Sequence, residues 1–292
     1  MPETASSAVK RGFTDIEEGQ VHYRIARPKK DQGKQPVVMC HGSPTSSLTF
    51  APLMECFAHS RVVFAADTLG QGDSCPPADM EAEMPYFGDA VRRIIDTMGP
   101  EFENFDLYGT HTGAAIAAEL ALAAPERVNK LILDGTIVTF PEWATKYVDH
   151  LDNSHLIDTN GTQFFTMWNN MRNVMLFWPP YETDPEHMRP CGLPSAQKLH
   201  EMVVDSLKGI RTNHVAYRAA VLYKAKERLP QISVPTLVAC AKWDMLWPEM
   251  EPAAELIPGA ISMCHPHDQP ESHATPEELN DLTEMLTGWL DA

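Results

Sequence analysis

The most informative stretch of the sequence is Leu107-Tyr-Gly-Thr-His-Thr-Gly-Ala-Ala-Ile-Ala-Ala-Glu-Leu-Ala121. It predicts a strand that ends in a tight turn and continues directly into a helix. Gly109 and Gly113 lack a Cβ atom, so they allow the strand and the helix to approach each other closely. His111 lies between them and is expected at positive φ, a region that histidine tolerates better than most residues. The stretch therefore predicts a strand, a strained turn and a helix, with an imidazole at the turn.

Short apolar runs alternate with helical patterns on both sides of this unit. The strands expected from these runs are residues 20–26, 37–40, 62–66, 105–108, 128–133, 236–241 and 261–264, the first of them as an outer strand. The expected helices are residues 53–59, 86–98, 112–124, 249–256 and 276–290. Apolar strands separated by helices predict an α/β fold with a mostly parallel central sheet flanked by helices on both faces.

The alternation stops between Thr136 and Leu229, where aromatic residues recur at helical spacing without a clear strand. Residues 137–229 are therefore predicted to form a helical lid, inserted into a core of residues 1–136 and 230–292. A lid over a cavity needs apolar side chains to cover it. Of the aromatic residues, we expect Trp143, Trp168 and Trp178 to contact a substrate, and others to form a small core within the lid.

Composition and charge exclude several classes of partner. The 292 residues contain 23 Lys plus Arg and 40 Asp plus Glu, which gives a net charge of −17. Such a surface repels phosphate backbones and anionic lipid, so neither nucleic acid nor membrane is expected, and a small molecule is the expected partner. No apolar run is long enough for a bilayer, and Met1 to Lys10 lacks the apolar centre of a secretory signal. Six cysteines without Cys-x-x-Cys spacing favour a reduced, cytoplasmic protein of undetermined oligomeric state.

Four motifs, in this order and spacing, resemble the α/β-hydrolase superfamily over nearly the whole chain. They are His41-Gly-Ser-Pro44, Asp67-Thr-Leu-Gly-Gln-Gly-Asp-Ser74, Gly109-Thr-His-Thr-Gly113 and Ala241-Lys-Trp-Asp244. In that family they look like the oxyanion loop, a Gly-rich turn beside the site, the nucleophile elbow and the acid of the catalytic triad. The resemblance implies a hydrolase in which Asp244 is the acid and the backbone N–H groups of Ser43 and Thr112 form the oxyanion hole.

Two triad positions depart from this family. The elbow holds His111, where the family has Ser, Asp or Cys. The triad histidine normally lies about seven residues before the Pro-Glu-Glu of the last helix, a position that is Gln269 here. A shift of two residues would place His267 there instead, and Pro270 leaves that register open. The residues expected to carry the chemistry are therefore His111, Asp244 and Gln269.

A neutral imidazole at the elbow needs no separate base. The reference pKa of histidine, about 6.5, leaves most of the ring unprotonated at pH 7. His111 is therefore expected to attack a carbonyl carbon, to deprotonate a water, or to take a proton from a substrate carbon. The first two reactions hydrolyse an ester, lactone, thioester or activated C–C bond of a small apolar carbonyl compound. The third makes a cofactor-free lyase, decarboxylase or isomerase, and a purely structural His111 would leave a non-catalytic receptor.

The contact between His111 and Asp244 separates these alternatives. We expect the two side chains to meet directly or through one water beside Gln269, whereas a ring turned away from Asp244 would favour the receptor. Other polar residues are expected to play smaller parts. His41 is expected to brace the oxyanion loop and also to contact the substrate, and Asp134 is an alternative acid or a cap of its turn. His265, His267 and His273 show metal-like spacing, but a solvated loop accounts for it, and neither metal nor cofactor is expected.

Overall fold

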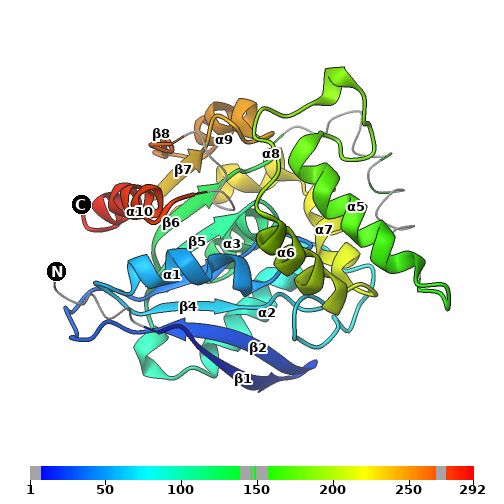
Figure 1. Ribbon diagram of the computed structural model, residues 1–292. Coiled ribbons are helices and arrows are strands. Elements are labelled where there is room, and N and C mark those ends of the chain that lie inside the picture. The colour runs from blue at the N-terminus through cyan, green and yellow to red at the C-terminus, as the bar shows by residue number, and fades with distance from the viewer. Residues whose placement is uncertain (1–7, 139–145, 147, 149–156, 268–273) are drawn as a thin grey trace, which may run out of the picture.

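The computed structural model describes residues 8–138, 146, 148, 157–267 and 274–292. Its centre is an eight-stranded sheet in the order β1-β2-β4-β3-β5-β6-β7-β8 (Figure 1). The strands are β1 (Lys10–Ile16), β2 (Gly19–Ala26), β3 (Val37–Cys40), β4 (Val63–Ala66), β5 (Phe105–Thr110), β6 (Val128–Asp134), β7 (Thr236–Cys240) and β8 (Ile261–Cys264). All neighbouring strands from β4 to β8 pair in parallel. β1 pairs antiparallel with β2, and β2 pairs antiparallel with β4. The mostly parallel sheet expected from the sequence is confirmed.

β1 is the one strand that the sequence did not predict, and it displaces β2 from the edge. β1 pairs with β2 from Lys10 opposite Ile25 to Ile16 opposite Gly19. None of its seven residues is fully buried. Backbone hydrogen bonds therefore hold this strand rather than burial of apolar side chains, so it leaves little hydrophobic signal in the sequence.

Helices cover both faces of the sheet (Figure 1). One face packs against α2, α3 and α9, and the other against α1 and α10, in two separate apolar cores. No helix in the described ranges has both the length and the apolar character needed to cross a membrane. The helices are α1 (Ala51–Phe57), α2 (Met84–Asp96), α3 (Thr112–Ala123), α5 (Thr162–Leu176), α6 (Ala196–Lys208), α7 (Asn213–Val221), α8 (Ala225–Arg228), α9 (Met250–Leu256) and α10 (Pro276–Leu290), with short 3-10 turns η1 (Ser47–Phe50), η2 (Pro100–Phe102), η3 (Pro185–His187), η4 (Leu229–Gln231) and η5 (Trp247–Glu249).

The segment between β6 and β7, here called the helical insertion, contains α5 to α8. Apart from a single bridge between Phe177 and Met188, its described part is helix, turn and loop. α6 is tied to the core by the buried carboxylate of Asp205, which accepts hydrogen bonds from the backbone N–H and the hydroxyl of Ser46, both at 2.8 Å. These bonds fix α6 above the loop that follows β3.

The strand register brings the chemically interesting residues to one edge of the sheet. Cys40 lies opposite Gly109, Thr110 opposite Asp134, and Cys240 opposite Cys264. The carboxyl ends of β3, β5, β6, β7 and β8 are therefore nearly level. Because the predicted site residues follow these strands, the sheet collects them at its carboxyl edge, where parallel sheets bind ligands.

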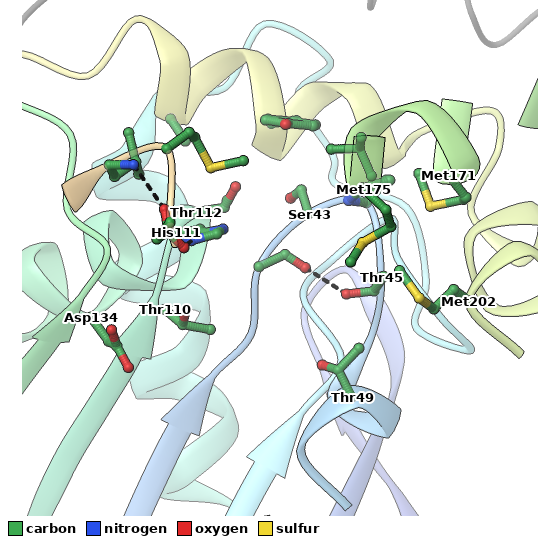
Figure 2. Close-up of a pocket in the computed structure, with 18 of the residues that line it drawn as sticks. Ser43, Thr45, Thr49, Thr110, His111, Thr112, Asp134, Met171, Met175 and Met202 are labelled. Atoms are coloured by element: carbon green, nitrogen blue, oxygen red, sulfur yellow. Dashed lines mark hydrogen bonds and ion pairs between the residues drawn. The ribbon is translucent and has the colours of Figure 1, made fainter. Parts of the chain in front are cut away.

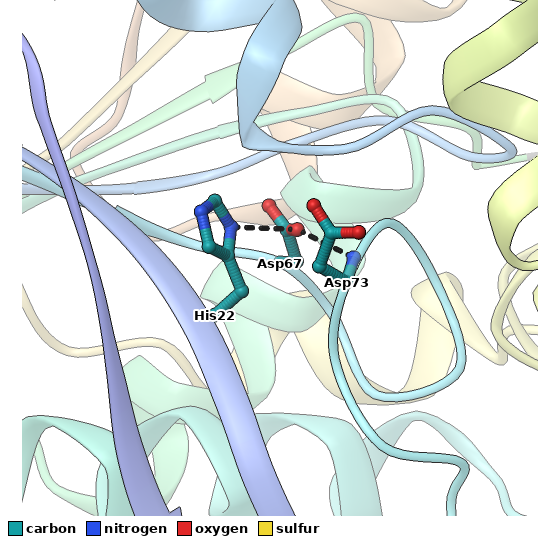
Figure 3. Close-up of side chains that lie close together, drawn as sticks. All are labelled: His22, Asp67 and Asp73. Atoms are coloured by element: carbon teal, nitrogen blue, oxygen red, sulfur yellow. Dashed lines mark hydrogen bonds and ion pairs between the residues drawn. The ribbon is translucent and has the colours of Figure 1, made fainter.

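The loop after β4 is organised by Asp67 (Figure 3). Its carboxylate accepts hydrogen bonds from His22 Nδ1 at 2.9 Å, from the Ser47 hydroxyl and backbone N–H, and from the backbone N–H of Asp73 at 3.0 Å. Burial alone would raise the pKa of Asp67, but the His22 hydrogen bond, the His41 charge and the Ser47 hydroxyl hold it well below its usual range. His22, Asp67 and Asp73 lie close enough to share a metal. Because protein donors already engage both Asp67 oxygens, we interpret this cluster as a structural tie between loops.

Glu18 joins the turn between β1 and β2 to α2, and this tie predicts how stability depends on pH. Arg93 donates to both Glu18 oxygens, at 2.5 and 2.6 Å. The Arg93 hydrogen bonds lower the pKa of Glu18 from 4.5 to about 2 against the effect of burial. We expect Glu18→Gln to lower the free energy of unfolding at pH 7 by about 1–3 kcal/mol. Because the folded-state pKa is depressed, this difference is complete above pH 4.5 and disappears as the pH falls towards 2.

Urea unfolding at several pH values measures this difference. The neighbouring exposed Glu17, changed to Gln, is the matched control and should alter the unfolding free energy little at any pH. An equal effect of Glu18→Gln at neutral and acid pH would contradict the role given to this ion pair.

Candidate active site

His111 occupies a sharp turn between β5 and α3. Its φ is 51° and its ψ is −115°, and among the described residues it is the one non-glycine residue at positive φ. Its N–H donates to the carbonyl of Asp134 at 2.9 Å, and its own carbonyl accepts from Ala114 at 2.9 Å. The strained turn expected from the sequence is confirmed, and neighbouring strand and helix hold it on both sides.

The flanking glycines are required by close backbone contacts. A Cβ atom on Gly113 would lie 1.9 Å from the carbonyl oxygen of Cys40, and one on Gly109 would lie 2.2 Å from the carbonyl oxygen of Gly113. The start of α3 is thus pressed against the ends of β3 and β5. This packing puts the loop at Gly42 beside the turn, where a Cβ would be 3.4 Å from His111 Cβ.

The imidazole of His111 meets the carboxylate of Asp244 directly. His111 Nε2 lies 2.7 Å from Asp244 Oδ2, so the contact expected from the sequence is confirmed and needs no intervening water. The other carboxylate oxygen, Oδ1, accepts from the backbone N–H of Leu246 at 2.8 Å. Burial alone would raise the pKa of Asp244, but the charge and hydrogen bond of His111, with Arg189 nearby, keep it below its usual value. Asp244 is therefore an anion beside His111.

This contact fixes the tautomer of the neutral ring. A carboxylate only accepts hydrogen bonds, so Nε2 carries the hydrogen and Nδ1 carries the lone pair. The His111 side chain is 37% exposed, whereas that of Asp244 is 7% exposed. The arrangement is a buried anion that orients an accessible base.

A cavity of about 290 Å³ lies between His111 and the helical insertion. Figure 2 shows His111 and Thr112 on one side of it, Met171, Met175 and Met202 on the other, and Ser43 between them. Most of its wall is apolar. The apolar and aromatic residues include Met167, Met171, Met175, Met202, Met245, Trp178, Trp243, Tyr217 and Tyr223, and the polar ones include Ser43, Thr45, Thr110, Thr112, Asp134, Arg189 and His265. The cavity suits a largely apolar molecule with a few polar groups.

Ser43, Thr112 and Trp178 line this cavity, as the sequence predicts. Gln71 Nε2 donates to the Ser43 hydroxyl at 2.5 Å and so holds the Ser43 side chain in place. Thr112 is the first residue of α3, where backbone N–H groups have no partner within the helix. Gln269 and Trp143 lie outside the described residues. The oxyanion hole at Ser43 and Thr112 stays a prediction.

Two residues expected to contact substrate lie elsewhere. His41 is fully buried and does not line the cavity, because its Nδ1 lies 3.0 Å from the Gly42 carbonyl and its Nε2 accepts from the backbone N–H of Thr68 at 2.9 Å. It braces the two loops instead. Trp168 is 39% exposed and is also absent from the cavity wall. The face of α5 that lines the cavity is formed by residues four positions apart, Met167, Met171 and Met175. Trp168 lies on another face of the helix.

The histidines after β8 have separate partners. His267 Nε2 lies 2.7 Å from Asp281 Oδ2 on α10, so its ring is engaged away from the cavity and does not replace Gln269. His265 Nε2 lies 2.9 Å from Asp134 Oδ2, and both residues line the cavity. From the sequence, His265 was expected only as a loop residue and Asp134 only as an alternative acid or a cap. Their positions, directly after β8 and at the end of β6, could have indicated that both lie at the carboxyl edge of the sheet.

Arg189 is a further cavity residue that the sequence did not reveal. Its guanidinium lies over the Trp243 ring, 5.3 Å from the centroid, and its Nη1 donates to the carbonyl of Val174. Its Nε and Nη2 atoms are buried without a hydrogen-bond partner in the described part of the chain, as is Trp243 Nε1. No motif marks Arg189, because it follows an irregular loop of the helical insertion.

Comparisons with known proteins agree with this architecture. Residues 35–259 match the family described as alpha/beta hydrolase fold. The chain is 38% identical over 110 residues to a 2-hydroxymuconate semialdehyde hydrolase from Pseudomonas sp. strain CF600, a match that covers 36% of this chain and only 38% of that protein. It is 25% identical over 268 residues to 2-hydroxy-6-oxononadienedioate/2-hydroxy-6-oxononatrienedioate hydrolase 2 from Pseudomonas putida, covering 87% of this chain and 86% of the relative. A proline iminopeptidase from Flavobacterium johnsoniae is 25% identical over 239 residues, covering 77% and 79%.

Solved structures share the same fold at low sequence identity. The enol-lactonase from Burkholderia xenovorans LB400 superimposes with a TM-score of 0.74 at 16% identity, covering 96% of this chain and all of that one. A thermophilic esterase from Thermogutta terrifontis gives 0.70 at 20% identity, covering 97% and 98%. Because the family model matches most of the chain, from residue 35 to residue 259, the chain belongs to the α/β-hydrolase fold family.

Proposed function

We propose that this protein hydrolyses an ester, lactone, thioester or activated C–C bond of a small carbonyl compound, with His111 and Asp244 as its base. The observation that carries the proposal is the 2.7 Å contact between His111 Nε2 and Asp244 Oδ2 at the edge of the cavity. The carboxylate holds the ring in one tautomer and stabilises the imidazolium that forms when Nδ1 takes a proton. One dyad thus supplies what a serine hydrolase divides between a nucleophile and a separate histidine.

Hydrolysis by this dyad needs no group outside the cavity. Nδ1 of His111 removes a proton from a water as the water oxygen attacks the carbonyl carbon. The negative charge that develops on the carbonyl oxygen is stabilised by the N–H groups of Ser43 and Thr112 and by the positive end of α3. If Nδ1 attacks the carbon itself, an acyl-imidazole forms and water then hydrolyses it. In both routes the bond between the carbonyl carbon and the leaving group then breaks, and the leaving group takes its proton from the His111 ring or from water.

The helical insertion acts in this proposal as a lid over the dyad. Residues 137–229 form the lid, and residues 1–136 and 230–292 form the hydrolase core. Support comes from α5, α6 and α7, each of which contributes residues to the cavity wall opposite His111. By covering the dyad, the lid excludes bulk water and strengthens the electrostatic interactions inside.

The buried donors of Arg189 favour a substrate that carries an anionic group. Three buried donors, Arg189 Nε, Arg189 Nη2 and Trp243 Nε1, have no acceptor within the described residues, and both side chains line the cavity. A buried unpaired donor costs about 1–3 kcal/mol, and a ligand carboxylate would satisfy these donors. The name of the Pseudomonas putida relative, a dienedioate hydrolase, also denotes a dicarboxylate. The substrate we propose is therefore apolar along most of its length, with a carboxylate at the Arg189 end.

A cytoplasmic location and a small-molecule partner complete the proposal. All six cysteines are free thiols, which suits a reducing compartment. The net charge of −17 disfavours polyanionic partners but does not oppose a small anion that has a dedicated cation in the cavity.

The first prediction concerns the dyad. We expect Asp244→Asn and His111→Gln each to lower kcat for 4-nitrophenyl ester hydrolysis by about 10²- to 10⁴-fold, because each removes the oriented base. Asp281→Asn is the matched control, since it breaks a similar histidine–carboxylate pair away from the cavity, and it should leave kcat unchanged. Wild-type activity in Asp244→Asn, or stoichiometric labelling of a serine by a fluorophosphonate, would refute the mechanism.

A second prediction tests the anionic substrate. Arg189→Gln should raise KM for mono-4-nitrophenyl glutarate by about 10- to 100-fold, because a charge-assisted hydrogen bond is lost. KM for the neutral 4-nitrophenyl pentanoate should stay the same. Arg172→Gln, an exposed change of equal charge on α5, serves as the control. Equal effects of Arg189→Gln on KM for the two esters would contradict the proposal that Arg189 binds a substrate carboxylate.

A third prediction uses Gly135, which follows β6 at φ +64°. A Cβ atom there would lie 2.5 Å from His111 Cδ2 and 2.8 Å from Nε2, so Gly135→Ala should push the ring off Asp244. We expect kcat to fall by about 10²-fold. Gly259→Ala carries similar strain at φ +74° with no heavy atom within 4 Å of the new Cβ, so it separates backbone strain from the ring contact. Equal losses of stability and activity in the two variants would show that backbone strain, and not the position of the His111 ring, lowers kcat.

A further inference from the structure

Gln71 is a buried amide that links three parts of the chain beneath the cavity. It lies in the Gly-rich turn after β4, and its side chain is inaccessible to solvent. Its Nε2 lies 2.5 Å from the Ser43 hydroxyl, in the loop after β3. The same nitrogen lies 3.2 Å from the carbonyl oxygen of Asn213, the first residue of α7. Gln71 has no part in the reaction derived above, although it contacts a residue of the cavity wall.

The Asn213 carbonyl determines which atom of the Gln71 amide faces Ser43. A carbonyl oxygen only accepts hydrogen bonds, so the amide atom beside it is the NH2 group. The opposite orientation would place Gln71 Oε1 against the Asn213 carbonyl, two acceptors 3.2 Å apart. The NH2 group has a hydrogen for each contact and no lone pair to offer. Gln71 is therefore the donor to Ser43, and the Ser43 hydroxyl oxygen is the acceptor.

The turn that holds Gln71 is packed tightly against the helical insertion. The Thr212 hydroxyl donates to the carbonyl of Gly70 at 2.7 Å. A Cβ atom on Gly209 would lie 2.5 Å from the same carbonyl oxygen. Because the neighbouring backbone is held in this way and the side chain is buried, the Gln71 amide has little freedom to change its direction.

The direction of this bond leaves the Ser43 hydroxyl with its hydrogen to donate. A hydroxyl has one hydrogen, and no group within the described residues accepts the hydrogen of Ser43. Ser43 is partly exposed and lines the cavity, where Figure 2 shows it between His111 and the methionines of the helical insertion. The preceding residue, Gly42, touches the turn, since a Cβ atom on it would lie 3.4 Å from His111 Cβ. The hydrogen is therefore available to a ligand on the His111 side of the cavity.

From this hydrogen-bond direction we infer that the Ser43 hydroxyl donates to the carbonyl oxygen of the substrate, and that Gln71 is the positioning residue that makes it a donor. The inference rests on the proposed hydrolysis. The proposed substrate has two polar groups, a carboxylate at Arg189 and the carbonyl group that reacts at His111. Because Ser43 lies beside the His111 turn, the carbonyl oxygen is the acceptor for its hydroxyl. The side chain of Ser43 thus adds a donor to the N–H of the same residue.

No proton changes its place in this contact. As water attacks the carbonyl carbon, the carbonyl oxygen gains negative charge, and the hydrogen bond from the Ser43 hydroxyl becomes stronger. When the intermediate collapses, the carbonyl double bond forms again and the hydrogen bond weakens. The hydroxyl therefore stabilises the transition state more than the bound substrate. Its loss lowers kcat more than it raises KM.

Variants that change the direction of the bond test this inference. Ser43→Ala removes the hydroxyl and keeps the backbone N–H, while in Gln71→Glu a carboxylate accepts the Ser43 hydrogen and withdraws it from the substrate. With mono-4-nitrophenyl glutarate we expect each to lower kcat by about 10- to 100-fold and to change KM by less than about threefold. Gln71→Met removes the donor without adding a charge, so it covers the case in which Gln71→Glu does not fold. It should lower kcat by about three- to tenfold in the wild type and no further in Ser43→Ala, because both changes act on one bond.

Gln231→Glu is the matched control, because Gln231 Nε2 also donates to a backbone carbonyl, that of Glu227 at 2.8 Å, but on the exposed surface and away from the cavity. It should leave kcat unchanged. Wild-type kcat in Ser43→Ala would overturn the inference and leave the hydrolase proposal intact. An equal effect of Gln71→Met on kcat in the wild type and in Ser43→Ala would overturn it too, since Gln71 would then act through the fold. If wild type does not hydrolyse the ester, the hydrolase proposal fails, and this inference fails with it.

Discussion

The site depends on the contact between the start of α3 and the end of β3. A Cβ atom on Gly113 would lie 1.9 Å from the Cys40 carbonyl oxygen, so only glycine permits this approach. The approach leaves one residue to turn from strand to helix, and that residue, His111, is held at φ 51°. The same contact places the loop after β3 beside it. The relative positions of His111, the expected oxyanion donors and the N-terminus of α3 are thus set by backbone packing.

Features set by local sequence were predictable. The bounds of β8 and α10 agree with the sequence to the residue, because an apolar run and a proline start with a capping box leave little freedom. The contact between His111 and Asp244 also agrees with the sequence, since both residues lie in turns that follow parallel strands and so are brought to one edge of the sheet. β1 was missed because its residues are polar or half-exposed, so burial gives it no periodic signal.

Features set by packing between distant segments were not predictable. The inward face of α5 is the one that packs against α6. The methionines, which are four residues apart, form that face, and Trp168 lies outside it. His265 finds Asp134 across β7, a pairing decided by side-chain direction after two separate strands. Arg189 reaches Trp243 and the cavity from an irregular loop that carries no pattern. In each case the sequence supplied the residue type but not its neighbour.

Two hydrogen bonds from Ser46 to Asp205 join α6 to the loop after β3. Ser46 is three residues from Ser43 in that loop, and both of its bonds to the Asp205 carboxylate are buried at 2.8 Å. A molecule that displaces the α6 wall must therefore also shift the backbone around Ser43. Because such coupling is reciprocal, negative charge bound in the proposed oxyanion hole at Ser43 would alter the affinity of the α6 wall by the same free energy. In the proposed mechanism, the size of the ligand and the charge on its carbonyl oxygen are therefore linked through the buried carboxylate of Asp205.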